Sequence, residues 1–192
     1  MGELTLSARL ADHTRSLILA SAVELLEAEP VSGLTVRAVA ARAGISERTV
    51  FRYFATRDDF LEAVASEVAR RLELPAPPAT VDELPDFADR LYRRFEAKAA
   101  LTRAALHTEI FSRMRDTQAR ERWASVQRLV DAYAPRRSAE ARAIAAANIR
   151  YFLSATTWHY YRTHFGFELE RAIACAHVAV AQALEALKPR AR

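Results

Sequence analysis

Apolar residues recur at steps of three and four along almost the whole chain, which is the spacing of one face of an α-helix. The sequence has only four glycines and no Asn-Gly pair of the kind that turns a β-hairpin, so strands are not expected. We therefore predict an all-α protein of about nine helices. Their expected ranges are 7–29, 35–42, 47–54, 57–74, 82–107, 108–114, 116–133, 139–164 and 168–187.

The two short helices near the N-terminus have recognisable capping residues. Thr35 and Ser46 each precede a short apolar-periodic segment and can accept a hydrogen bond from its first turn. Gly44 is expected to end the first short helix, since glycine adopts the left-handed conformation at little cost. Thr56 is the expected cap of the longer helix that follows. The small core predicted between the short helices consists of Val39, Ala40, Ile45, Val50 and Phe54.

The chain is expected to form two domains. A three-helix N-terminal domain is predicted over residues 1–55, and a helical bundle over residues 56–192. Prolines at positions 75, 77 and 78 form the clearest linker in the chain, because proline cannot continue a helix.

Composition fits a soluble globular chain with a substantial core, since 51% of residues are hydrophobic and 27% are charged. No apolar stretch is long enough to span a membrane, and the first residues lack the pattern of a secretory signal, so a cytoplasmic location is expected. The single cysteine, Cys175, cannot form an internal disulfide and lies among alanines, as a small core residue would.

The positive charge is unevenly distributed. The whole chain has a net charge of +4, yet residues 1–74 carry nine arginines against eleven acids. Within that part, however, residues 35–57 carry five arginines against Glu47 alone, a local net charge of +4. Screening makes such a local cluster more relevant to phosphate binding than the total charge.

Residues 34–61 have the pattern of a helix-turn-helix, with a tight turn at residues 43–45 between two short helices. The second helix of such a motif enters the major groove of DNA. Its predicted solvent face offers guanidinium, hydroxyl and phenol groups that can contact guanine edges and phosphates. This face is expected to hold Glu47, Arg48, Thr49, Arg52 and Tyr53.

At these residues the sequence resembles the TetR family of bacterial repressors. The matching positions, counted from the helix that holds Ile18, are Thr35, Val39, Ala40, Gly44, Ile45, Ser46, Thr49, Phe51, Arg52, Tyr53, Phe54, Arg57, Phe60 and Leu61. They cover some fifty residues, while the remaining 140 or so match only in being helical.

The resemblance implies roles for individual residues. Thr35 and Arg37 correspond to phosphate contacts at the start of the second helix, and Arg57 stands where the family usually has a phosphate-binding lysine. Residues 46–49, together with Arg52 and Tyr53, correspond to the recognition helix. The candidate DNA-binding residues are therefore Thr35, Arg37, Ser46, Glu47, Arg48, Thr49, Arg52, Tyr53 and Arg57.

Three positions depart from the family pattern. Phe51 stands where tyrosine is common, so a hydroxyl-to-phosphate bond is missing or is taken by Tyr53. Pro30 replaces a frequent glycine, which changes only a loop. Arg48 replaces a frequent glycine and could read guanine directly.

A homodimer is expected, because one recognition helix touches too few bases to select a site, and dimers bind palindromic half-sites of double-stranded DNA. The last helix shows two apolar stripes, and the helix before it is alanine-rich, so the last two helices are the predicted interface. The first stripe consists of Leu169, Ile173, Ala176, Val180, Ala183 and Leu187. The second stripe, beside the first, consists of Ala172, Cys175, Ala179 and Ala186. A single bundle without a partner is the alternative.

The resemblance also implies a pocket in the C-terminal domain for a small apolar or aromatic effector. The candidate ligand-binding residues are Phe95, His107, Phe111, Trp123, Phe152, Thr156 and His159. For each residue taken singly, a place in the plain core is the favoured alternative.

An enzyme is not expected, and neither catalytic residues, cofactor nor metal is predicted. The sequence has no Gly-rich phosphate loop and no serine between glycines, and His159 and His164 are too far apart in helical register to share a metal. The predicted function is a ligand-responsive repressor. The alternatives are an activator, a DNA-binding protein of the same fold that senses no ligand and, from another class and less favoured, an all-helical enzyme.

Overall fold

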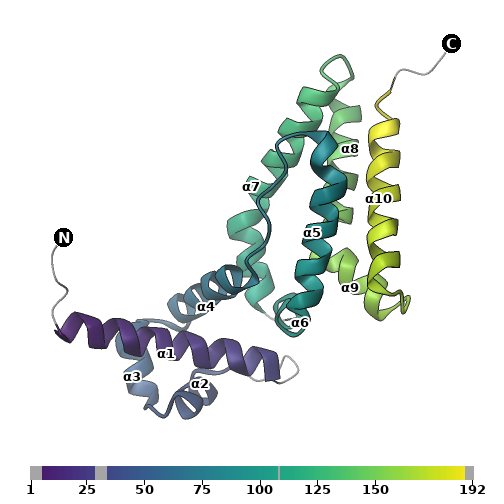
Figure 1. Ribbon diagram of the computed structural model, residues 1–192. Coiled ribbons are helices and arrows are strands. Elements are labelled where there is room, and N and C mark those ends of the chain that lie inside the picture. Colours follow the sequence, from purple (N-terminus) through teal and green to yellow (C-terminus); the bar gives the residue numbers. More distant parts are fainter. Residues whose placement is uncertain (1–5, 29–33, 108, 189–192) are drawn as a thin grey trace. The chain divides into compact units, whose positions relative to one another are not determined.

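The computed structural model describes residues 6–28, 34–107 and 109–188, with side chains described from residue 8 and outside 109–119. Within these residues the chain forms ten α-helices, one short 3-10 helix and no strand, so the predicted all-α fold is confirmed (Figure 1). The elements are α1 (Leu6–Ala28), α2 (Val36–Ala43), α3 (Glu47–Tyr53), α4 (Arg57–Leu72), η1 (Val81–Glu83), α5 (Leu84–Ala97), α6 (Ala99–His107), α7 (Glu109–Tyr133), α8 (Ala139–Phe152), α9 (Ala155–Thr163) and α10 (Leu169–Glu185).

The chain divides into two compact units. The first unit comprises Met1–Arg71 and Ala100–Met114, and the second comprises Leu72–Ala99 and Arg115–Arg192. The first unit therefore includes most of α4 and α6 in addition to the three helices at the N-terminus. The domain boundary expected after residue 55 stays a prediction.

The first unit is built on α1, which packs against α2, while α2 packs against α3. The apolar residues of α1 that repeat at helical spacing are buried, among them Ile18, Ala22 and Leu26. The N-terminal half of α4 adds Phe60 and Leu61 to the buried set. These contacts hold the helix-turn-helix on a scaffold of two longer helices.

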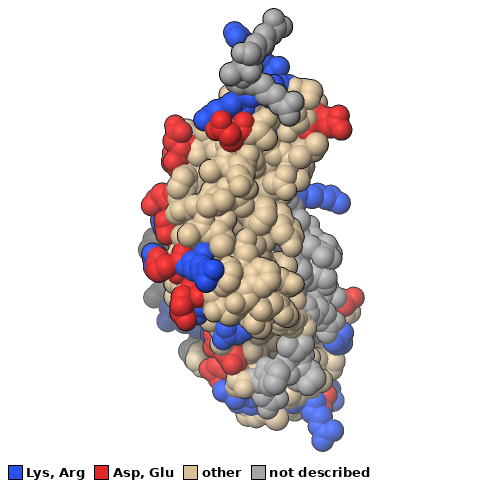
Figure 2. All heavy atoms as spheres, turned by 90° about the vertical axis from the view of Figure 1, so that its right-hand side faces the viewer, with Lys and Arg blue, Asp and Glu red and all other residues tan. Residues whose placement is uncertain are grey.

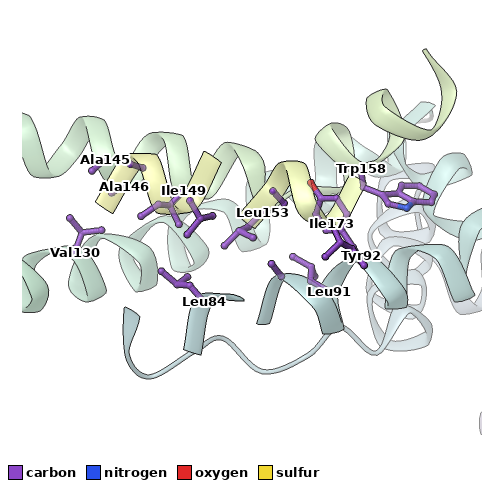
Figure 3. Close-up of a cluster of buried hydrophobic side chains, with 14 of the residues drawn as sticks. Leu84, Leu91, Tyr92, Val130, Ala145, Ala146, Ile149, Leu153, Trp158 and Ile173 are labelled. Atoms are coloured by element: carbon purple, nitrogen blue, oxygen red, sulfur yellow. The ribbon is translucent and has the colours of Figure 1, made fainter. Parts of the chain in front are cut away.

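The second unit has its own core, in which α10 packs against both α8 and α5. Figure 3 shows this core, with side chains from α5, α7, α8, α9 and α10 meeting between the helices. Tyr92 is fully buried there, and its hydroxyl donates a hydrogen bond of 2.7 Å to the carbonyl oxygen of Phe152. The buried indole of Trp158 donates from Nε1 to Glu96 at 3.0 Å, and Arg162 holds both oxygens of the same carboxylate. These bonds join α9 to α5.

The single helix predicted over residues 139–164 is wrong. Leu153 leaves the helical conformation with φ −93° and ψ 56°, and Ser154 starts α9 as its N-cap. The hydroxyls of Ser154 and Thr157 each donate a bond of 2.6 Å to the carbonyl of Tyr151. The break is therefore stabilised by local side-chain hydrogen bonds, without glycine or proline.

Two further helix boundaries differ from the prediction. The expected helix 82–107 is interrupted at Lys98, whose φ of −117° and ψ of 36° separate α5 from α6. The expected helices 108–114 and 116–133 form one helix, α7. Because the sequence of α7 contains no glycine or proline, nothing in it requires the predicted interruption.

Candidate nucleic-acid interface

The predicted caps of α2 are confirmed. Thr35 has extended backbone angles, and its hydroxyl oxygen accepts a hydrogen bond of 3.1 Å from the backbone N–H of Ala38. Gly44 ends the helix in the left-handed conformation, with φ 68° and ψ 29°. The chain thus turns sharply after α2, and Ile45 N–H closes the turn on the carbonyl of Ala40 at 3.0 Å.

The start of α3 also follows the prediction. The Ser46 hydroxyl oxygen accepts from the backbone N–H of Thr49 at 3.1 Å, and the two hydroxyl oxygens lie 2.9 Å apart. Val50 is 1% exposed and Phe54 is 4% exposed, so the inner side of α3 is anchored in the core of the first unit. The rings of Phe54 and Phe60 meet edge to face at 5.6 Å, which ties the end of α3 to α4.

The outward face of α3 consists of Glu47, Arg48, Phe51 and Arg52, all of which are exposed. Their spacing of one and four residues is that of a single helical face. Thr49 is half-buried and bonded to Ser46, so it lies at the edge of this face. Phe51 is 44% exposed and was not among the predicted contacts, although helical projection from the buried Val50 would have identified it.

Tyr53 points away from this outward face. It is half-buried, and its hydrogen bond with the Thr14 side chain, on α1, is the main cause that lowers the pKa of its phenol. The guanidinium of Arg52 lies 5.4 Å from the centre of the Tyr53 ring. The tyrosine thus links α3 to α1.

The arginines of residues 34–57 have different surroundings. Arg42 is paired with Glu24 of α1, with Nε 2.9 Å from the carboxylate, so its charge is partly neutralised. All five arginines of this segment are exposed, and the four besides Arg42 are Arg37, Arg48, Arg52 and Arg57. Together with the N-cap Thr35, which is also exposed, they give the helix-turn-helix a positive surface that suits phosphate contacts.

Charged side chains line an open groove of about 410 Å³ between α1 and α4 in the same unit. Glu67 accepts hydrogen bonds from Arg70 at 2.7 Å and from Arg71 at 2.8 Å. The bond from Arg70 is the main cause that lowers the pKa of Glu67 to about 2. The carboxylate is thus committed to an ion pair on the surface of α4.

The candidate ligand-binding residues have diverse environments. Phe95 is 3% exposed, and its ring lies 5.9 Å from that of Trp158 within the core of the second unit. Phe152 and His159 are half-buried, and His159 Nδ1 is 3.1 Å from the Thr163 hydroxyl. Trp123 and Thr156 are exposed in the second unit, His107 is exposed in the first, and the side chain of Phe111 lies outside the described residues.

The two predicted stripes of α10 prove to face mainly inward. Ile173, Ala176 and Val180 of the first stripe belong to the core, and Ala172 of the second is fully buried. The outward apolar face of α8 and α10, here called the α8–α10 face, is formed by other residues. They are Ile144, Ala147 and Tyr151 of α8 and Ala174, Val178 and Ala181 of α10.

The α8–α10 face exposes three large apolar side chains, with Ile144 57%, Tyr151 60% and Val178 56% exposed. Figure 2 shows a broad uncharged surface on this side of the molecule, with most charged side chains gathered toward its edges. An apolar centre with a charged rim is the usual composition of a protein interface.

Two classes of site receive no support from the described residues. None of the described helices is long and apolar enough to cross a bilayer. In the same part of the chain, His, Cys, Asp and Glu side chains do not gather in threes as a metal site would require.

Residues 18–64 match the family model of bacterial regulatory proteins of the tetR family. Among solved structures, the chain is similar to a protein from Mesorhizobium loti MAFF303099 that is assigned to the TetR-family transcriptional regulators. The sequence identity is 18% and the TM-score 0.49, and the match covers 92% of this chain and 96% of that chain. No curated protein sequence matches the chain.

Proposed function

We propose that this chain is a homodimeric, ligand-released repressor of the TetR family, because residues 18–64 match the family model of the bacterial regulatory proteins of that family. This match supports DNA binding through the helix-turn-helix and a role in transcription regulation. The finer parts of the proposal are the symmetric operator, the dimer, the effector and the sign of regulation. The single observation that best supports DNA binding is the exposed, arginine-bearing outward face of α3 above a buried Val50.

We propose that α3 enters the major groove while the start of α2 lies on the phosphate backbone. Exposure of Arg48 and Arg52 supports base or phosphate contacts, because a guanidinium can donate two bonds to guanine. Arg37 and Arg57 are exposed on either side of α3 in the sequence and suit phosphates. The proposed contact set keeps Thr35, Ser46, Glu47, Thr49 and Tyr53 as well, with Tyr53 acting mainly through its link to α1.

We propose that two chains associate through the α8–α10 face. The small side chains of Ala147, Ala174 and Ala181 allow close approach of helices, and Ile144, Tyr151 and Val178 supply apolar area. Two helices from each chain would form a four-helix interface about a twofold axis. Such an axis would present two copies of α3 to two half-sites of a palindromic operator.

We further propose that an apolar or aromatic effector binds in the second unit and favours a dimer that fits the operator poorly. The half-buried Phe152 and His159 and the exposed Trp123 support this more directly than Phe95, which is 3% exposed and packs against Trp158 in the core. A thermal-shift screen of aromatic compounds tests the effector. Ligand at 100 times its Kd should stabilise the protein by about 2.7 kcal/mol.

The decisive experiment is DNA binding by the Arg52→Ala variant. We expect operator affinity to fall by about 1–3 kcal/mol for each half-site, measured by fluorescence anisotropy on a site selected from genomic DNA at fixed salt. Arg103→Ala is the matched control, because it removes the same charge from an exposed position of α6. Equal losses in the two variants would refute the proposed contact, and failure of the unmodified protein to bind any duplex would refute the function.

A further inference from the structure

Phe51 is an exposed aromatic residue on the outward face of α3. Its side chain is 44% exposed, whereas Phe54, three residues later, is 4% exposed. At about 100° of rotation per residue, Phe51 projects between Glu47 and Arg48, and Arg52 lies on the far side of Arg48. A groove that receives the guanidinium groups of Arg48 and Arg52 therefore also receives the ring of Phe51.

The chemistry of this ring restricts what it can recognise. Phenylalanine has no group that bonds to a phosphate or to the polar edge of a base, so its contact must be apolar. In the major groove the apolar group of the bases is the 5-methyl of thymine. The nearest aromatic hydroxyl on α3 belongs to Tyr53, and it is engaged by Thr14 on the opposite side of the helix.

Resting on the proposed function, we infer that Phe51 is a specificity-determining residue that packs against the 5-methyl group of a thymine in each half-site. This thymine should lie within a base pair or so of the bases that Arg48 and Arg52 contact, because the three side chains share one face. The operator would thus be selected in part by a methyl group.

The experiment uses the full-length protein and an operator obtained by selection from random duplexes. Each thymine is replaced in turn by uracil, which removes only the methyl group, and affinity is measured by fluorescence anisotropy. We expect one thymine in each half-site at which uracil weakens binding about fourfold, and about fifteenfold when both half-sites are changed. In the Phe51→Ala variant the same replacement should change affinity less than twofold.

Two further variants keep the result interpretable. Phe51→Leu retains an apolar side chain and should still prefer thymine to uracil, while Leu10→Ala removes an exposed apolar side chain from α1 and should behave as the unmodified protein. Circular dichroism and melting verify that each variant is folded.

The outcomes separate the two proposals. Binding that is indifferent to uracil at every thymine, or a Phe51→Ala variant that still distinguishes thymine from uracil, overturns the inference and leaves DNA binding intact. A protein that selects no duplex overturns the proposed function itself.

Discussion

Replacement of Val178 by arginine is the sharpest test of the dimer. Val178 lies between Ala174 and Ala181 on the outward side of α10 and is 56% exposed in the single chain. In the proposed dimer it is covered by the partner, and the twofold axis brings two copies into one interface. The large apolar side chains assigned to the same face, Ile144 and Tyr151, offer no carboxylate to an incoming guanidinium.

The size of the effect follows from the cost of burying charge. An unpaired ion in an apolar interface costs several kcal/mol, and a long arginine reduces this cost by reaching toward the rim. We take about 3 kcal/mol for each chain and about 6 kcal/mol for each dimer, which weakens association by about 10⁴-fold. A dimer with a nanomolar Kd would then dissociate largely at low micromolar concentration.

Sedimentation velocity over a concentration series measures this change. The unmodified protein should sediment at twice the mass of the 21.5 kDa chain, and Val178→Arg at the mass of one chain, with unchanged helical content. Ala132→Arg is the matched control, because it adds the same charge at an exposed position of α7, outside the two helices of the face. A Val178→Arg protein that sediments like the unmodified one would refute the assignment of the α8–α10 face.

Three further predictions concern stability and DNA binding. Tyr92→Phe leaves the buried carbonyl of Phe152 without its donor, so urea unfolding should show a loss of about 1–3 kcal/mol; unchanged stability would mean that another donor replaces the phenol. The carboxylate of Glu67 has a pKa lowered from 4.5 to about 2 by Arg70, so its ion pair stabilises the fold above pH 4.5 and is lost as the pH falls through about 2. Because Arg70 is 70% exposed, Glu67→Gln should cost only about 1 kcal/mol at pH 7, and unfolding curves should converge for the two proteins in acid; a constant difference would contradict the linkage. Changing Tyr53 to Phe should weaken operator binding less than Arg52→Ala does, since the phenol faces α1; the reverse order of affinities would place Tyr53 on the DNA side.

The helix-turn-helix could be predicted closely because its signals are local. Thr35, Gly44 and Ser46 act on the backbone within three or four residues of themselves, and their roles follow from side-chain chemistry alone. The family resemblance added the direction in which the motif faces. The resemblance did not show that Phe51 lies on the outward side of α3 and that Tyr53 lies on the side of α1. That difference depends on the position of α1, which covers one side of α3.

The second unit was less predictable because its determinants are distant in sequence. The break after α8 depends on hydrogen bonds from the hydroxyls of Ser154 and Thr157 to the carbonyl of Tyr151. A serine and a threonine within an apolar helical pattern do not predict such a break. The outward side of α10 could not be identified from the sequence for a related reason. Alanine and valine occupy both the inner and the outer positions of this helix, so apolar periodicity alone could not show which stripe meets the core.

The turn at Gly44 has a consequence for mutational tolerance. A Cβ atom added there would meet no neighbour within 4 Å, so a clash of the added Cβ does not limit replacement at this position. Its φ of 68° nevertheless lies where most L-amino acids are strained by about 1–2 kcal/mol. The backbone strain should therefore decide which replacements are tolerated at this position. In a library of variants, we expect asparagine and aspartate to be retained most readily, and valine and isoleucine least.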